Sequence, residues 1–253
     1  MSGHSKWHSI KHKKGKEDAK RGQLFSKLSQ KITVAAREGG GNLEANPTLA
    51  SAVETARSYS MPMDNIKRAI AKGTGELAGG QLEHMSFEGY GEAGVALLVE
   101  VVTDNRNRAA SEVRRAFTRA GAHLGETGSV AWIFEKKGVF LVPQDPAHNE
   151  EELLEIALEA GADDLEAEGD YWEIVCDVEH FGSVRDGLKT AGVEIENSEL
   201  TMFPRNTIRL DRDSARKVLK LIEALEDLTD VTDVYANFDI PDEVLEEEAA
   251  SLD

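Results

Sequence analysis

Residues 95–103 read Val-Ala-Leu-Leu-Val-Glu-Val-Val-Thr, and this run decides the fold class. A short apolar run rich in valine and leucine, preceded by glycine and followed by polar residues, is typical of a buried strand. The next segment, Arg108–Ala120, has the period of an amphipathic helix, with apolar residues at Ala109, Val113, Ala116 and Phe117. A strand followed by such a helix predicts an α/β unit.

Together with the segments that follow, this unit gives two strand–helix–strand–strand–helix–strand sets. The contiguous set, from about 138 to 205, has strands at 138–143, 164–167, 171–177 and 194–203 and helices at 150–160 and 184–191. The second set combines strand 95–103, helix 108–120 and strand 129–134 with strand 207–210, helix 214–226 and strand 231–238. This is the ferredoxin-like pattern twice, one copy inserted in the other. A linear arrangement is the alternative, but it leaves each half of the outer copy incomplete.

The N-terminal part has a helical pattern. Leu24, Leu28 and Ile32 recur four residues apart until Gly39–Gly41 end the helix. A second helix begins at Asn46-Pro47, and a third runs from near Pro62 to Gly73. Residues 73–94 are rich in glycine and predict a linker or long loop.

The predicted fold class is therefore α+β, an N-terminal helical bundle followed by two ferredoxin-like α/β domains, one inserted in the other. The predicted divisions are a basic arm, a helical bundle, an outer α/β domain in two pieces, an inserted acidic α/β domain and an acidic tail. Their bounds are 1–21, 22–75, 76–137 with 206–240, 138–205 and 241–253.

The net charge of −18 is unevenly distributed. Residues 1–75 hold 14 Lys and Arg against 6 Asp and Glu, a local charge of +8. The remaining residues hold 15 Lys and Arg against 41 Asp and Glu, a local charge of −26. Because a polyanion responds to the local field, we expect a basic module that binds nucleic acid, joined to an acidic body.

The basic arm has too little apolar surface to fold alone. Its lysines would neutralise phosphates and release counterions. The indole ring of Trp7 would stack on an unpaired base, and such stacking matters more for RNA or single strands than for duplex DNA. A solvated tail without function is the alternative. The predicted nucleic-acid contacts of the arm are Lys6, Trp7, His8, Lys11, His12, Lys13, Lys14, Lys16, Lys20 and Arg21.

A second basic cluster surrounds the start of the predicted helix 108–120. One helical face carries Arg108, Arg115 and Arg119 together with Glu112. Arginine forks suit phosphate groups. The alternative, which the spacing alone favours, is a salt-bridged solvent face with Asp104 or Asn105 capping the helix. The candidate nucleic-acid contacts of this cluster are Arg106, Arg108 and Arg115.

No motif indicates catalysis or a cofactor. The single cysteine, Cys176, has apolar and acidic neighbours, so we interpret it as strand packing. His4, His8 and His12 are four apart, but we interpret them as part of the basic arm and not as a metal site. The GxGxxG match at 89–94 lacks the flanking strand and helix of a dinucleotide site. We expect a protein without enzymatic activity, cofactor or metal.

No stretch approaches the ~20 apolar residues that span a bilayer. The N-terminus is basic and polar, with no apolar segment behind it that would make a secretory signal. We therefore expect a cytoplasmic protein that does not bind membranes.

Five motifs occur in order along the chain. They are the opening MSGHSKWHSIKHKK at 1–14, MPMDNIKRAIAKGTG at 61–75, TDNRNR at 103–108, GETGSVAW at 125–132 and FEKKG at 134–138. Together they resemble the YebC/PmpR family. The similarity extends from residue 1 to about 240. One departure is Gly91-Glu-Ala-Gly94, where a Gly-Pro-Gly-Gly-like turn is usual, and it affects a loop only.

The resemblance implies an N-terminal helical domain and two α/β domains, one inserted in the other. It also implies a probable transcriptional regulator that binds DNA, which is our first hypothesis. The family resembles the mitochondrial translational activator of cytochrome c oxidase, and bacterial members are linked to relief of ribosomes stalled on proline-rich stretches. A ribosome-associated factor that binds rRNA or tRNA is therefore the alternative, and a protein-interaction scaffold is the third. The oligomeric state stays open, a homodimer included.

Overall fold

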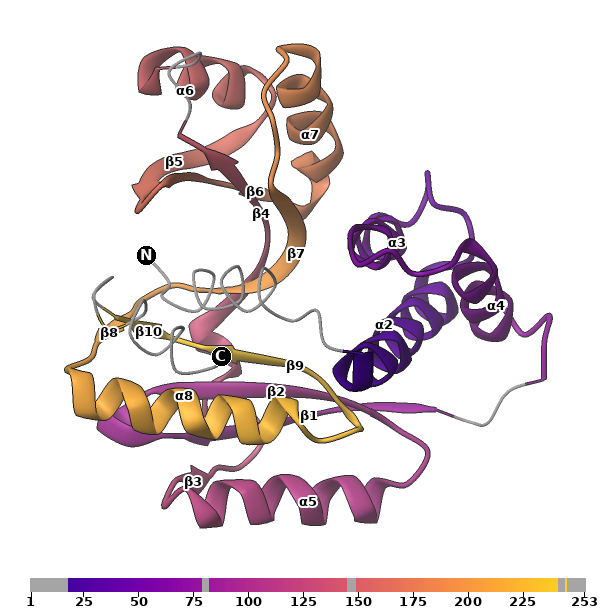
Figure 1. Cartoon of the computed structure of the whole chain (residues 1–253), viewed down its shortest axis with the longest axis vertical. Coiled ribbons are helices and arrows are strands. Elements are labelled where there is room, and N and C mark those ends of the chain that lie inside the picture. Colours follow the sequence, from indigo (N-terminus) through magenta and orange to yellow (C-terminus); the bar gives the residue numbers. More distant parts are fainter. Residues whose placement is uncertain (1–17, 79–81, 145–148, 241–243, 245–253) are drawn as a thin grey trace.

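The computed structural model describes residues 18–78, 82–144, 149–240 and Val244 (Figure 1). Three helices come first: α2 (Asp18–Gly39), α3 (Pro47–Ser58) and α4 (Met63–Gly73). They share a core that includes Leu28, Ile32, Leu49, Val53 and Ile66. Helix α2 begins at Asp18, so residues 18–21 of the predicted arm lie in this helix.

The bounds of α3 follow from the sequence signal at Asn46-Pro47. The Asn46 side chain accepts a hydrogen bond from the Leu49 backbone N–H at 3.0 Å, as an N-cap does. Its amide nitrogen also donates to the carbonyls of Ala35 and Gly40, both at 2.8 Å. One buried side chain therefore starts α3 and ties it to the end of α2. The predicted helix start is confirmed.

The first sheet has the strand order β3-β1-β2-β9, and all its pairs are antiparallel. Its strands are β1 (Glu83–Tyr90), β2 (Ala96–Thr103), β3 (His123–Leu124) and β9 (Val231–Ala236). Helices α5 (Arg106–Arg119) and α8 (Arg212–Glu226) cover one face (Figure 1). Strand β2 is buried on both faces, because Leu97 and Val99 pack toward these helices while Ala96 and Leu98 pack on the opposite face.

Strand β1 contradicts the predicted linker at 73–94. Its sequence is polar, but Met85 and Phe87 alternate toward the core of the first sheet. Gly89 suits the strand because a Cβ there would lie 2.5 Å from the His123 carbonyl oxygen and from the Phe117 ring. Strand β1 lies between β2 and β3, in the position that the ferredoxin-like pattern assigns to the predicted strand 207–210.

For the outer unit, the strand predicted at 129–134 was wrong, and the strand predicted at 207–210 is present but does not belong to the first sheet. Residues 129–134 form a short 3-10 helix, Ala131–Ile133, before β4 begins at Phe134. Residues 207–210 contribute only β8 (Ile208–Arg209), which pairs in parallel with β10 (Phe238–Asp239) in a separate two-stranded sheet. The residue pattern indicated neither the 3-10 helix nor the pairing of β8 with β10, because strand pairing depends on residues elsewhere in the chain. A further 3-10 turn spans Glu92–Gly94.

The second sheet agrees with the predicted contiguous set. Its elements are β4 (Phe134–Pro143), α6 (Glu150–Glu159), β5 (Ala162–Glu168), β6 (Tyr171–Asp177), a 3-10 turn (Val178–His180), α7 (Phe181–Thr190) and β7 (Asn197–Pro204). The strand order β5-β6-β4-β7 is the ferredoxin-like order. In sequence the set lies between β3 and α8, so the nested arrangement, and not the linear one, describes the two sheets. The predicted domain bounds stay a prediction.

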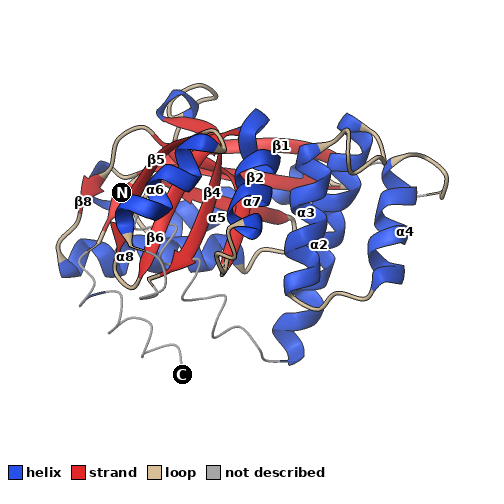
Figure 2. Cartoon of the chain, turned by 90° about the horizontal axis from the view of Figure 1, so that it is seen from above, coloured by secondary structure: helices blue, strands red, loops and turns tan. Residues whose placement is uncertain are grey.

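The three helices lie at one end of the molecule, against both sheets (Figure 2). The Lys31 ammonium pairs with the Asp233 carboxylate of β9, and the Ser51 hydroxyl accepts from the Leu200 backbone N–H at 3.1 Å. A hollow of about 280 Å³ remains where these parts meet. Within the described ranges, no helix is long and apolar enough to cross a membrane.

Candidate nucleic-acid interface

Helices α5 and α8 lie next to each other on the outer face of the first sheet. Each has one apolar stripe that packs on the sheet, through Val113 and Phe117 of α5 and through Val218 and Ile222 of α8. The amphipathic pattern therefore fixes which residues of each helix remain at the surface. The next residues around each helix face the other helix and line a groove between them.

The groove carries four cations and one carboxylate. Arg115 and Arg119 come from α5, one helical turn apart, and Lys217 and Lys220 come from α8. Glu112 is the one acidic residue of the lining. Lysine and arginine heads held along both sides of a groove attract a phosphate chain, and a groove also focuses their field.

Most of these cations are available to a ligand. Arg115, Arg119 and Lys220 are exposed, and between described residues no ion pair joins any of the three to a carboxylate. Lys217 pairs with Glu92 at 2.8 Å, and this hydrogen bond raises the pKa of the Lys217 ammonium. Three cations without an ion pair to the described part of an otherwise acidic body are therefore available to bind an anion.

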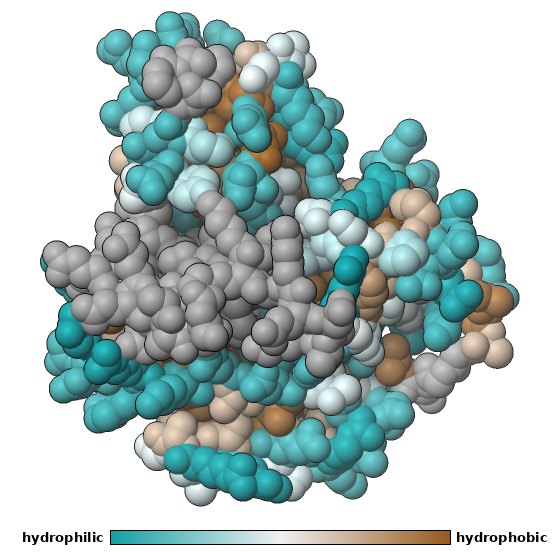
Figure 3. All heavy atoms as spheres, viewed as in Figure 1, coloured by the Kyte–Doolittle hydropathy of each residue, from teal (hydrophilic) through white to brown (hydrophobic). Residues whose placement is uncertain are grey.

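The floor of the groove is apolar. It consists of Ala116 of α5 and Ala120, the residue after α5, with Leu221, Ala224 and Leu228 on the side of α8. Figure 3 shows an apolar strip between the hydrophilic outer surfaces of α8 and α5. The groove has a volume of about 480 Å³ and is open to solvent. A nucleic-acid strand has charged phosphates and flat apolar bases, so the cations at the sides suit its phosphates and the apolar floor suits its bases.

The first described residues of α2 lie beside one end of this groove. The Gln23 side chain donates to the Asp227 carbonyl oxygen at 2.8 Å, and Leu228, the next residue, lines the groove. Arg21 is exposed, and its guanidinium carbon lies 5.5 Å from the centre of the Phe25 ring. The start of α2, with the exposed Arg21, therefore lies near the groove.

Most of the predicted arm contacts lie outside the described residues. These are Lys6, Trp7, His8, Lys11, His12, Lys13, Lys14 and Lys16. Lys20 lies in α2, where only its backbone is described. Arg21 is exposed, and Arg115 lines the groove. The roles of all eleven stay predictions.

Arg106 and Arg108 are engaged by carboxylates of the fold. Arg106 pairs with Glu83 at 3.2 Å, and Arg108 pairs with Asp104 at 2.9 Å and with Asp230 at 2.8 Å. The Asn105 side chain caps α5 by accepting from the Arg108 backbone N–H at 3.1 Å. Arg108 therefore fits the alternative interpretation, a salt-bridged helix start with an Asn105 cap. A phosphate would have to displace two carboxylates to reach its guanidinium.

Lys217 and Lys220 were missed as site residues by sequence reasoning. They lie about a hundred residues from Arg115, in a helix that also carries acidic residues, so their local charge pattern gave no signal. Only the packing of α8 against α5 brings the two pairs of cations together.

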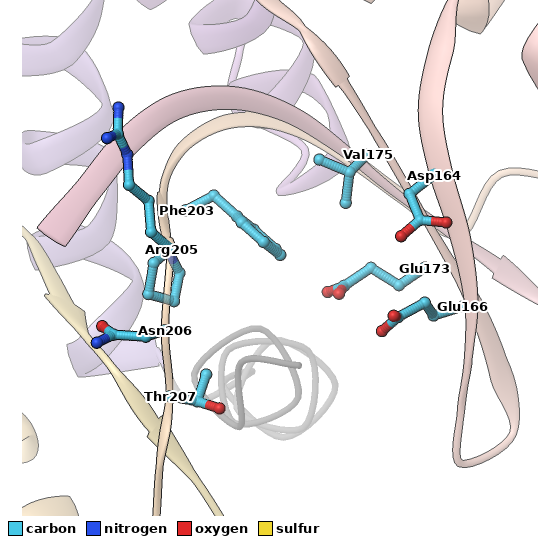
Figure 4. A pocket seen from close by; sticks show the side chains of 9 residues that line it. Asp164, Glu166, Glu173, Val175, Phe203, Arg205, Asn206 and Thr207 are labelled. Carbon is cyan, nitrogen blue, oxygen red and sulfur yellow. The ribbon is translucent and has the colours of Figure 1, made fainter.

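A second hollow, of about 230 Å³, lies beside the second sheet and does not fit a phosphate chain. The carboxylates of Asp164, Glu166 and Glu173 point into it, whereas the Arg205 guanidinium points away from them (Figure 4). Like charges would repel a polyanion there.

Cys176 is buried in the second sheet. Burial and then the carboxylates of Asp163 and Asp177 raise the pKa of the Cys176 thiol to about 12, so the thiolate needed for a nucleophile is disfavoured. In the part of the chain that the structure describes, no group of three or more His, Cys, Asp or Glu side chains is placed to hold a metal ion.

Comparisons with known proteins identify the family. A family model described as TACO1/YebC protein N-terminal domain matches residues 5–76, and one described as TACO1/YebC second and third domain matches residues 82–238. A probable transcriptional regulatory protein of Rubrobacter xylanophilus is 58% identical over 250 residues, which cover 98% of this chain and 100% of the relative. A protein of the same name from Dictyoglomus turgidum is 52% identical over 246 residues, covering 97% and 99%.

A solved structure supports the same assignment. The crystal structure of a conserved hypothetical protein from Aquifex aeolicus has a TM-score of 0.80 and 49% sequence identity to this chain. The match covers 93% of this chain and 97% of the other, so the predicted α+β fold class is confirmed. The two family models together span nearly all of the described residues, and the chain belongs to the TACO1/YebC family.

Proposed function

We propose that this protein is a non-enzymatic, nucleic-acid-binding regulator of gene expression, and that it acts as a DNA-binding transcriptional regulator. The observation that carries the proposal is the basic groove between α5 and α8, which lies beside the N-terminal part of α2 on a chain whose net charge is −18. The names of the relatives support the regulatory part, since several are called probable transcriptional regulatory proteins.

The groove and the arm have different tasks in this proposal. The lysines of the arm contact phosphates over a long reach, and Arg115 and Arg119 hold the backbone at a fixed place on the folded body. Phosphate contacts position a protein on its partner and carry no sequence information. The acidic remainder of the chain repels other segments of the polyanion and so limits non-specific wrapping.

Crosslinking in living cells tests this proposal. After ultraviolet irradiation, the RNA and the DNA attached to the protein are both sequenced, for the wild type, for Lys11, Lys13, Lys14 and Lys16 changed to Glu, and for Arg115→Glu with Arg119→Glu. Discrete promoter DNA that is lost in both variants is the expected result. Recovery of rRNA or tRNA instead would make the ribosome-associated alternative the correct one, and recovery of neither would refute nucleic-acid binding.

A further inference from the structure

The most exposed large hydrophobic side chain among the described residues is that of Trp132, which is 66% exposed. It belongs to the short 3-10 helix between the first sheet and β4. The residues on either side are anchored, since Val130 is fully buried and Ile133 is 6% exposed, in a cluster with Leu98 and Phe134. The backbone that carries the exposed ring is therefore held in place by buried neighbours on both sides.

A buried carboxylate holds the preceding loop. Glu88 of β1 is 4% exposed and accepts hydrogen bonds from the backbone N–H groups of Gly128 at 2.7 Å, Val130 at 2.7 Å and Ala131 at 2.8 Å. A carboxylate that accepts three backbone N–H groups fixes the conformation of all the residues that supply them. The backbone that leads to Trp132 is therefore determined before any ligand arrives.

The indole itself is also held. Its Nε1–H donates to the Ser129 carbonyl oxygen at 3.0 Å, and the Tyr90 hydroxyl donates to the same oxygen at 2.9 Å. With its N–H group already occupied, the indole offers a partner its flat face and not a hydrogen bond. A flat, rigid and exposed ring loses little entropy when another flat group stacks on it.

A cationic residue is anchored to the residue that follows Trp132. The Arg205 backbone N–H donates to the Ile133 carbonyl oxygen at 2.8 Å, which places Arg205 next to the residue that follows Trp132. Its side chain is 64% exposed, and its ion pair with a described residue is a long one, 3.5 Å to Glu135. A cation next to an aromatic face is the combination that binds single-stranded nucleic acid, through a phosphate and a stacked base.

We propose that Trp132 is a stacking platform for one unpaired base of the bound nucleic acid, with Arg205 beside it for the adjoining phosphate. This inference rests on the proposed function, and it names the feature that the partner must have. Bases inside a duplex are already stacked on their neighbours, so the partner supplies an unpaired or flipped-out nucleotide at this position.

The test compares a single strand and a duplex of equal length and at equal salt concentration. Trp132→Ala is expected to weaken binding of the single strand about tenfold and to change duplex binding less than about twofold. Trp132→Phe keeps a ring and is expected to bind the single strand with an affinity between those of the wild type and Trp132→Ala. The matched control is Leu158→Ala, which removes another exposed apolar side chain, 49% exposed, and is expected to change neither affinity.

A second readout reports directly on the ring. In a variant with Trp7→Phe and Trp172→Phe, Trp132 is the one remaining indole, and a stacked base is expected to quench its fluorescence with the single strand but not with the duplex. Unchanged emission, or a Trp132→Ala variant that binds the single strand like the wild type, would overturn the inference while leaving the proposed function intact. Loss of self-association in Trp132→Ala, with both affinities unchanged, would assign the ring to a protein interface instead. A wild type that binds neither oligonucleotide would refute the proposed function itself.

Discussion

Arg108 and Asp230 form a two-pronged ion pair that connects the start of α5 to the residue before β9. The Arg108 Nη2 atom lies 2.8 Å from Oδ2 and 2.9 Å from Oδ1 of Asp230, and Nε lies 3.1 Å from Oδ2. Asp230 is buried and also accepts from the Thr103 hydroxyl at 2.9 Å. The pair joins segments 122 residues apart and so links the two halves of the first sheet.

Replacing Asp230 is expected to destabilise the first sheet. Asp230→Ala leaves the buried Thr103 hydroxyl without its acceptor, which costs about 1–3 kcal/mol. Urea unfolding followed by circular dichroism measures this loss. Arg108→Lys is expected to destabilise less, because it keeps a charge but loses the planar fork. If Arg108→Lys binds nucleic acid more weakly while its stability is unchanged, Arg108 is a phosphate contact after all.

The groove is expected to contribute about one phosphate contact for each arginine. Arg115→Ala with Arg119→Ala should reduce the slope of log K against log salt concentration by about 2, since each lost contact removes close to one released counterion. Titrations at several salt concentrations measure the slope.

Arg114→Ala is the matched control for that experiment. Arg114 is exposed and adjacent to Arg115 in sequence, but it does not line the groove. Equal effects of Arg114→Ala and Arg115→Ala would show that only total charge matters and that the groove holds no phosphate.

Glu88 is expected to make stability depend on pH on the acid side. Burial raises the pKa of the Glu88 carboxyl, but the N–H groups of Gly128, Val130 and Ala131 more than offset it, so the pKa lies below its ordinary value of 4.5. A lowered folded-state pKa contributes stability that is present above about pH 4.5 and is lost as the pH falls through the lowered pKa. Glu88→Gln is therefore expected to cost about 1–3 kcal/mol at pH 7 and less below pH 4.

Unfolding of Glu88→Gln and the wild type between pH 3 and 7 tests this expectation. Glu83→Gln is the control, since Glu83 lies on the same strand but pairs with Arg106 at the surface. If Glu88→Gln lowers the free energy of unfolding by the same amount at every pH, the ionised carboxylate of Glu88 does not supply the stability. Stronger quenching of Trp132 by iodide would show in addition that the loop has loosened.

Lys31 is expected to hold the helical bundle against the first sheet. Its ammonium bonds to Asp233, and although burial lowers the pKa of Lys31, the charge and hydrogen bond of Asp233 more than offset this and raise it. Lys31→Met keeps the apolar stem but leaves the carboxylates of Asp233 and Glu199 without a cation, at a cost of about 1.5–3 kcal/mol.

Chemical unfolding of Lys31→Met and of Lys31→Met with Glu199→Gln tests the same cluster. Burial is the main cause of the raised pKa of Glu199, and Lys31 acts against it, so removing the Glu199 charge is expected to restore part of the lost stability. Lys67→Ala, on the exposed side of α4, serves as the control. Additive effects of the two substitutions would show that Lys31 and Glu199 do not interact.

Local signals predicted those elements whose residues specify them without distant partners. The caps and apolar periods of α3, α5 and α8 and the hairpin of β5 and β6 are confirmed close to their predicted bounds. Strand β1 was missed because its sequence is polar, and it is a strand only because β2 and β3 pair with it on both sides. Hydrogen bonds that its neighbouring strands supply leave no trace in the residue pattern of β1 itself.

The sequence by itself determined the charge partition, the fold class and the family, because these follow from composition, periodicity and motifs along the chain. Only the tertiary structure decided which basic residues share a surface. It drew Arg108 into an ion pair with Asp230, placed Arg115 and Arg119 opposite Lys217 and Lys220, and left Trp132 exposed above the buried carboxylate of Glu88. The physical reason is that a binding surface is made of side chains far apart in sequence, and their proximity depends on how helices pack and strands pair.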